Sequence, residues 1–347
     1  MKKSFTLLLV VLSSLIIAQP TSFTSRGIGG GGALFAVAIN PANNNEYYVY
    51  CDMGELFHTT NFGTSYNQVH FTECIGGHNS RVCFTNSVGL LYSVNYANNE
   101  VVPVKSTDNG VTWATLAGNP DNTEETFSID ADYNNPLRVI ISYYGSIHFS
   151  NNGGTTFTSI HIATTGSGNT VGGVFFDGNN IYIGTNDGAL VSTNGGTTWN
   201  TATITGLPAT DRIWSFAGAK VGAVTRFFCI TADVGDLYVG IVGSDYFNYA
   251  KGIYSVDYGA GNWVSKSTGI NLANTFPMFV GMATNDINTV YLAGSNSISE
   301  PTVLKTTNAG TSWANTFNCT GNANVITGWS GQGGDRGREQ PPRQQPP

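Results

Sequence analysis

A short motif that recurs six times limits the folds open to this chain more than any other feature of its sequence. The motif is an octapeptide of the form Ser/Thr, any residue, Asp/Asn, any residue, Gly, any residue, Thr/Ser, aromatic. Its starts are spaced by 47, 44, 42, 63 and 51 residues, and the fifth copy carries one inserted residue. Repeats of this length are typical of β-propellers, in which each repeat forms one four-stranded blade. The copies begin at Thr59, Ser106, Ser150, Ser192, Ser255 and Thr306.

The octapeptide has a physical explanation as a hairpin turn. The Asp or Asn oxygen can accept hydrogen bonds from nearby backbone N–H groups, and Gly supplies the positive φ that closes the turn. The aromatic residue then enters the next strand and packs between blades. Asn replaces Asp in four of the six copies, so the position needs no charge and is predicted to be structural rather than catalytic. The predicted structural residues are Asn61, Asp108, Asn152, Asn194, Asp257 and Asn308, with the aromatic residues Trp113, Trp199, Trp263 and Trp313.

The segments between the octapeptides share a second pattern of three short strands separated by polar turns. One repeat reads as strands at 174–176, 181–184 and 189–191, with turns rich in Gly, Asn and Asp between them. We therefore predict an all-β chain, a β-propeller of six or seven four-stranded blades. The count is six from the octapeptides, and seven if Gly29–Ile39 closes with the segment around Val325.

The two ends of the chain differ from the repeats. Met1-Lys2-Lys3, the apolar run Phe5–Ile17 and the small residue Ala18 have the form of a secretory signal peptide, so residues 1–18 are predicted to be cleaved. An uncleaved membrane anchor is the alternative, although the run is short for a bilayer. The remaining propeller, 19–337, is then exported to the extracellular space or the cell surface without a membrane segment.

Residues 338–347 are rich in Pro, Gln and Arg and contain no strand-forming residues, so we predict a disordered tail. Two origins remain open for it. In the first, a truncation or a shifted reading frame has altered the chain, and 19–337 is then an incomplete propeller or the first of two. In the second, the Pro-rich tail is natural.

Composition argues against several classes of partner. Charged residues are 11% of the chain, the formal net charge is -7, and Lys and Arg together number 15. Because no basic run precedes the C-terminus, we do not expect nucleic acid as a partner. The five histidines are scattered without ligand-like spacing, so we predict no metal site and no cofactor.

The five cysteines are an odd number, so at least one cannot pair within the chain. Cys74 and Cys83 flank a short polar loop and are the predicted disulfide in an oxidising compartment. Cys51 and Cys229 lie within apolar alternation and are predicted to be buried small hydrophobic residues.

The octapeptides resemble the Asp-box, or BNR, repeat of sialidases, sortilin-type receptors and several glycoside hydrolases. The N-terminal part, Gly29–Pro41 followed by Tyr50–Phe57, resembles the opening of glycoside hydrolase family 74, typified by xyloglucan-cleaving endo-β-1,4-glucanases. This resemblance implies that Asp52 is the general base. The sequence departs from the family pattern at Cys51, where Thr is usual, and at Glu55, where a second Gly is usual.

The same resemblance implies a second propeller that carries the general acid. Inverting hydrolysis needs two carboxylates about 6.5–9.5 Å apart, one to activate water and one to protonate the leaving oxygen. Since this sequence contains no second set of repeats, the first hypothesis is an exported polysaccharide-active protein that binds a β-1,4-glucan but scarcely cuts it. The alternative is a non-catalytic propeller that binds protein or glycan.

Several individual residues are candidates with two interpretations each. Asp52 and Asp233 are either the general base and an alternative acid or base, or ordinary turn carboxylates. Four aromatic residues either stack on sugar rings or pack in the core: Trp214, Trp329, Tyr143 and Tyr144.

Overall fold

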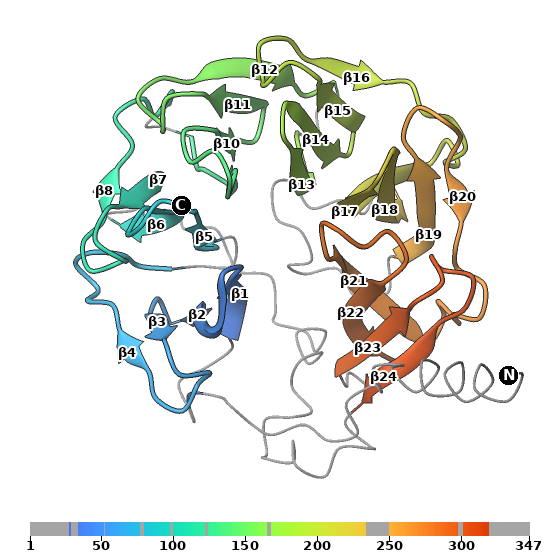
Figure 1. The fold of residues 1–347 in the computed structure, drawn as a ribbon, viewed down its shortest axis with the longest axis horizontal. Helices are drawn as coiled ribbons and strands as arrows, with labels where there is room; N and C mark the ends of the chain where they lie inside the picture. Colours follow the sequence, from blue (N-terminus) through green and yellow to red (C-terminus); the bar gives the residue numbers. More distant parts are fainter. Residues whose placement is uncertain are drawn as a thin grey trace, which may run out of the picture.

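Six antiparallel sheets of four strands each are arranged around a common centre in the computed structural model (Figure 1). The structure describes residues 28, 34–51, 53–76, 80–97, 100–121, 124–164, 168–233, 250–297 and 301–318. Within these ranges every regular element is a strand. The predicted all-β propeller is confirmed, with six blades. The predicted signal segment 1–18 and the tail 338–347 lie outside the described residues.

Each blade takes four consecutive strands in chain order. Blades 1 and 2 contain β1 (Leu34–Asn40), β2 (Asn43–Cys51), β3 (Leu56–Thr59) and β4 (Asn67–Gln68), then β5 (Cys83–Phe84), β6 (Leu91–Ala97), β7 (Glu100–Ser106) and β8 (Ala114–Thr115). Blades 3 and 4 contain β9 (Ser128–Ala131), β10 (Val139–Ser142), β11 (Ser146–Ser150) and β12 (Thr158–Ile162), then β13 (Val171–Asp177), β14 (Asn180–Thr185), β15 (Gly188–Ser192) and β16 (Asn200–Ala202). Blades 5 and 6 contain β17 (Asp211–Val221), β18 (Val224–Asp233), β19 (Ala250–Asp257) and β20 (Val264–Ser265), then β21 (Thr275–Met282), β22 (Val290–Asn296), β23 (Pro301–Thr306) and β24 (Ala314–Asn318).

The octapeptides form the turns between the third and fourth strands of the blades. In the copy that begins at Ser192, the Asn194 Oδ1 atom accepts hydrogen bonds from the Ser192 hydroxyl (3.0 Å) and from the Thr198 N–H (2.9 Å). The Asn194 Nδ2 atom donates to the Thr198 hydroxyl (2.8 Å), and the Gly196 N–H donates to Ser192 Oγ (2.9 Å). The same bonds from the seventh-position N–H to the third-position side chain recur at Asn61, Asp108, Asn152 and Asn308.

The fifth copy departs from this geometry. Its inserted residue lengthens the turn, and the Asp257 carboxylate instead accepts two hydrogen bonds from Arg226, Nε at 2.6 Å and Nη2 at 2.9 Å. Asp257 therefore anchors the turn of blade 5 to the neighbouring strand β18 by an ion pair.

The turns of blades 2, 3, 4 and 6 also touch the blade before them. Gly196 has φ +91°, and a Cβ atom there would collide with the ring of Phe149 in blade 3. In the same way, a Cβ at Gly154 would collide with Leu116, the residue after the last strand of blade 2. Glycine at this position is thus required twice, for a left-handed backbone and for close approach to the preceding blade.

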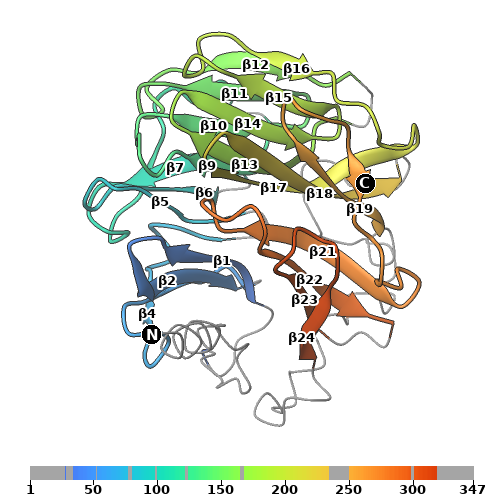
Figure 2. The ribbon, with the colours of Figure 1, turned by 45° about the vertical axis from the view of Figure 1, so that its right-hand side comes forward.

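The aromatic residue that ends the octapeptide packs at the same junction. Trp199 of blade 4 packs edge-to-face with Phe149, with ring centroids 5.5 Å apart. The indole N–H of Trp313 in blade 6 donates to the backbone oxygen of Lys266 in blade 5 (2.7 Å). The described residues form five apolar clusters, and each joins two consecutive blades from 1–2 to 5–6. Figure 2 shows the ribbon of these blades from a second direction.

We predict that Asn194→Ala lowers the free energy of unfolding by about 0.5–1.5 kcal/mol, because the exposed turn N–H at Thr198 loses its protein acceptor. Equilibrium unfolding in urea measures the change. Asn194→Asp is the matched control and should unfold near the wild type, since Asp108 occupies the same position in another copy. Equal losses in both variants would contradict the hydrogen-bonding role.

Candidate functional site

The candidate residues that the structure describes, Tyr143, Tyr144, Trp214 and Asp233, lie toward one end of the propeller. Because the strands are antiparallel, the turns between second and third strands lie at the end opposite the octapeptides, together with the connections between blades. We call this end the connection face. It includes the turns at 53–55, 143–145 and 186–187, and the start of β17.

Asp52, the predicted general base, lies outside the described residues. Its turn is described on both sides: the Cys51 N–H donates to Glu55 O (2.8 Å), and the Gly54 N–H donates to Cys51 O (3.0 Å). Gly54 has φ +98°, which favours glycine at this point of the turn.

Glu55 is a polar residue of this turn whose importance the sequence did not reveal. Its Oε2 atom is buried and has no hydrogen-bond partner among the residues that the structure describes. A buried acceptor of this kind is costly unless a donor reaches it, so Glu55 is a natural place for a ligand hydroxyl to bind. In the sequence, the only signal was that Glu55 stands where glycoside hydrolase family 74 has Gly.

Asp187 occupies the matching turn in blade 4. Its carboxylate accepts hydrogen bonds from His161 Nε2 (2.9 Å), the Thr164 N–H (2.9 Å) and the Thr164 hydroxyl (2.6 Å). Burial raises the pKa of Asp187, and the hydrogen bonds from His161 and Thr164 lower it by more, so the net pKa lies below its usual value. Asp187 therefore ties the outer strand of blade 3 to blade 4 and has no free acceptor for chemistry.

Asp233, the alternative acid or base, ends β18 in blade 5 beside Asp211 on β17. Asp211 is buried and accepts hydrogen bonds from the hydroxyls of Thr231 (2.7 Å) and Thr210 (3.3 Å). Asp233 is more exposed and forms an ion pair with Lys251, with 3.5 Å between Nζ and Oδ2. The Asp211 carboxylate is therefore fixed by hydrogen bonds, and the Asp233 carboxylate on the neighbouring strand is the more accessible of the two.

The two tyrosines of blade 3 differ in exposure. Tyr143 is fully buried, donates its hydroxyl proton to Asn119 and has a pKa raised to about 12 by burial. Its neighbour Tyr144 is 43% exposed. Beside it, the backbone N–H of Asn169 donates to Tyr144 O (2.7 Å), while both side-chain polar atoms of Asn169 are buried and have no hydrogen-bond partner among the described residues. Asn169 is fully buried, so Tyr144 provides the accessible surface here, an aromatic ring that suits an apolar ligand face.

Of the other aromatic residues predicted to contact a sugar, those that the structure describes do not present an exposed ring. Trp214 is 4% exposed, so together with Tyr143 it belongs to the core rather than to a surface that a sugar could reach. Trp329 lies outside the described residues. Tyr144 is thus the predicted aromatic contact that the described structure presents to solvent.

The predicted disulfide between Cys74 and Cys83 is absent. Both are buried free thiols: Cys74 lies 3.3 Å from the Tyr50 hydroxyl, and Cys83 donates to Ile129 O (3.3 Å). Cys74 packs in the cluster between blades 1 and 2, and Cys83 in the cluster between blades 2 and 3. Cys74 thus faces blade 1 and Cys83 faces blade 3, so the two thiols lie on opposite sides of blade 2. Strands allow this because their side chains alternate between the two faces of a sheet.

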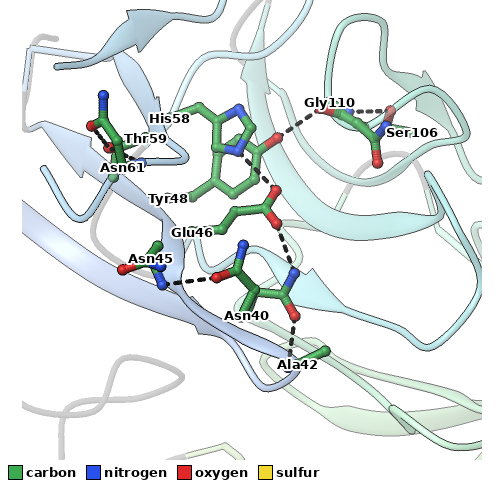
Figure 3. Close-up of polar contacts among 12 residues, drawn as sticks. Asn40, Ala42, Asn45, Glu46, Tyr48, His58, Thr59, Asn61, Ser106 and Gly110 are labelled. Carbon is green, nitrogen blue, oxygen red and sulfur yellow. Dashed lines mark hydrogen bonds and ion pairs between the residues drawn. The ribbon is translucent and has the colours of Figure 1, made fainter.

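Two hollows lie away from the connection face. One, of about 470 Å³, is beside the fifth octapeptide, and the other, of about 250 Å³, lies between blades 1 and 2 near Glu46. Figure 3 shows that Glu46 already bonds to Asn40 Nδ2 (2.7 Å) and His58 Nε2 (3.0 Å). The His58 ring stacks on Tyr48, whose hydroxyl donates to Asn109 O in blade 2. Asn40, Glu46 and His58 all belong to blade 1, and the hydrogen bond from Tyr48 to Asn109 connects this group to blade 2.

Within the described ranges, no three His, Cys, Asp or Glu side chains are grouped as a metal site. The same ranges contain no helix that is long and apolar enough to cross a membrane.

We predict that Asp187→Asn alters how stability depends on pH. A carboxyl whose pKa is lowered by folding stabilises the protein above its unfolded pKa of about 4, and this contribution is lost as the pH falls through the lowered pKa. The difference in unfolding free energy between wild type and variant should therefore be largest above about pH 5 and shrink in more acidic buffer. Urea unfolding from pH 7 to pH 3 measures it, and a constant difference would refute the linkage.

We predict that the buried thiols resist alkylation in the native protein. Burial raises the pKa of Cys74 to about 11, although the hydrogen bond with Tyr50 acts in the opposite direction, and burial also raises the pKa of Cys83 to about 11. Iodoacetamide should label both slowly at pH 8 and completely after denaturation without reductant. Peptide mass spectrometry that finds a Cys74–Cys83 cross-link would contradict the free thiols.

Comparisons with known proteins support the fold. No protein-family model and no curated protein sequence matches the chain. Among solved structures, an ancestral GH74 enzyme superposes with a TM-score of 0.60 and 19% identity over 82% of this chain and 38% of its own. The GH74 xyloglucanase from Xanthomonas campestris gives 0.62 and 15% over 84% and 46%. YCF48 bound to D1 peptide gives 0.53 and 12% over 86% and 88%.

The resemblance to GH74 enzymes expected from the sequence is thus confirmed at the level of the fold. The chain spans less than half the length of these two GH74 chains, whereas it spans most of YCF48.

Proposed function

We propose that this protein is a polysaccharide-active propeller that binds a β-1,4-glucan, such as the backbone of xyloglucan, on its connection face. The observation that carries the proposal is the exposed ring of Tyr144 on that face, together with the Glu55 Oε2 atom, which has no hydrogen-bond partner among the described residues. A glucan offers an apolar sugar face to the ring and hydroxyl groups to the carboxylate. The fold likeness to GH74 xyloglucanases supports the same ligand class.

Catalysis on this face would need two carboxylates on opposite sides of the sugar. We assign the general base to Asp52 from its place in the family motif. Asp233 is the weaker alternative, because Lys251 already pairs with it. The general acid would come from a second propeller domain, and this chain by itself would bind glucan far better than it hydrolyses it.

Export to the cell surface or beyond fits this role, since polysaccharide of this kind is encountered outside cells. The basis for export is the charged and apolar sequence of residues 1–18.

We predict that Tyr144→Ala weakens binding of xyloglucan oligosaccharides about tenfold, equivalent to ~1.4 kcal/mol, and that Glu55→Gln also weakens it. Isothermal titration calorimetry measures both. Phe62→Ala is the matched control, because Phe62 is also half-exposed but lies in an octapeptide at the opposite end. If all three variants bind like the wild type, the connection face is not the glucan site.

A second experiment addresses catalysis. Release of reducing ends from xyloglucan by a protein that contains both propellers should fall to background in Asp52→Asn. Unchanged release would remove Asp52 from the mechanism while leaving the binding proposal intact.

A non-catalytic peptide-binding propeller is the second candidate function. The observation that favours it is length: the chain matches YCF48, which was solved with a D1 peptide, over most of both chains. A folded wild-type protein that binds no β-glucan in the titration would favour this candidate.

A further inference from the structure

The hollow of about 250 Å³ between blades 1 and 2 lies outside the proposed glucan site. It is lined by the β1–β2 turn, the β5–β6 turn and the octapeptide of blade 2, so it opens at the end of the propeller opposite the connection face. Pockets that enclose a drug-sized ligand measure about 300–1,000 Å³. This hollow therefore suits a smaller group, such as one side chain of another molecule.

The wall of the hollow carries a negative charge. Glu46 is the one carboxylate among the described residues that line it, and its side chain is 20% exposed, so it is held in place within reach of solvent. None of these lining residues is Lys or Arg. The amides of Asn40, Asn86 and Asn109 and the hydroxyls of Thr85 and Ser87 supply further oxygen acceptors.

A second carboxylate adds to the negative potential at this place. Asp108 precedes Asn109 in the octapeptide of blade 2, and hydrogen bonds, chiefly from Thr112, lower the pKa of Asp108 to about 2, so it is ionised at neutral pH. Burial raises the pKa of the Tyr48 hydroxyl, and the charges of Glu46 and Asp108 raise it further. Since this hydroxyl donates to Asn109 O in the wall, both charges act on the hollow, which therefore favours a cation.

The existing contacts of Glu46 favour an ammonium group over a guanidinium group. Its Oε1 atom is bonded to His58 Nε2 (3.0 Å), and its Oε2 atom accepts from Asn40 Nδ2 (2.7 Å) (Figure 3). A guanidinium pairs best with a carboxylate whose two oxygens are both free to accept parallel hydrogen bonds. An ammonium is a compact point charge that needs only one oxygen, so it fits the acceptor sites that Glu46 has left.

Apolar side chains beside the carboxylate suit the stem that carries the ammonium. Phe84 and Tyr133 line the hollow, and Val88 at its mouth is 94% exposed. A long aliphatic stem can lie along such surface while its charged end reaches a carboxylate, and an aromatic ring attracts a nearby cation. A free amine would leave Val88 in water, whereas a protein that carries a lysine would cover it, and the hydrophobic effect favours the second arrangement.

We propose that the hollow between blades 1 and 2 binds a lysine side chain of a partner protein. The ammonium donates to Glu46, and the aliphatic stem lies against Val88 and Tyr133. Because the hollow and the connection face are at opposite ends of the propeller, this site stands independently of the proposed glucan binding.

Titration of the isotope-labelled full chain with the peptide acetyl-Ala-Lys-Ala-amide, followed by NMR at neutral pH, tests the proposal. The amide signals of Gly89 and Asn109 should shift. The matched peptide with norleucine in place of lysine should bind about tenfold more weakly, because it lacks the charge, and the peptide with arginine should also bind more weakly. Equal binding of the lysine and norleucine peptides would overturn the proposal.

A variant of the carboxylate identifies the site. Glu46→Gln keeps the volume of the side chain and should weaken binding of the lysine peptide about tenfold. Glu100→Gln is the matched control, because Glu100 is an exposed carboxylate at the opposite end of blade 2, and it should bind like the wild type. Unchanged binding by a folded Glu46→Gln protein would remove the carboxylate from the site and overturn the proposal.

A variant at the mouth keeps the test valid if Glu46→Gln does not fold. Val88 is almost fully exposed, so its replacement should not disturb folding. Val88→Lys places a competing ammonium beside Glu46 and should weaken binding of the peptide, whereas the uncharged Val88→Gln should not. Equal binding by these two variants would contradict the proposal. Binding of n-butylamine without binding of the lysine peptide would assign the hollow to a free amine and also overturn it.

Discussion

The contacts that the octapeptide turns of blades 2, 3, 4 and 6 make with the blade before them hold this fold together. The glycine of the turn allows backbone to lie directly on an apolar side chain, as Gly196 does on Phe149, and the aromatic residue three positions later fills the space beside it. The turn glycine and the aromatic residue depend on each other for this contact. A side chain at the glycine would force the blades apart, and without the hydrogen bonds to Asn194 the turn would not hold the tryptophan in place.

The fold could be predicted because its determinants are local. Eight consecutive residues specify the turn, and the spacing of the copies specifies one blade each, so six copies give six blades. The tolerance of Asn at the third position also follows from local geometry, since Asn61 and Asp108 accept the same backbone hydrogen bond. The exception at Asp257 arises where one extra residue changes the spacing within the turn.

The site was less predictable because burial of single atoms depends on contacts between blades. Cys74 and Cys83 are close in sequence, yet they face different junctions of the ring. Tyr143 and Tyr144 are adjacent and similar, but one is fully buried and the other exposed. The burial of polar atoms of Glu55 and Asn169 without a partner in the described structure could not be read from the sequence, because it depends on contacts between segments that are distant in the chain.

Because each later blade packs on its predecessor, the order of assembly is built into the chain. The aromatic residue of the octapeptide, Trp113 in blade 2 and Phe157 in blade 3, packs in the cluster shared with the preceding blade, and the same holds in blades 4 to 6. A blade emerging from the ribosome therefore finds its docking surface already made. Such vectorial growth uses contacts between neighbouring repeats only, which favours rapid folding without long-range search.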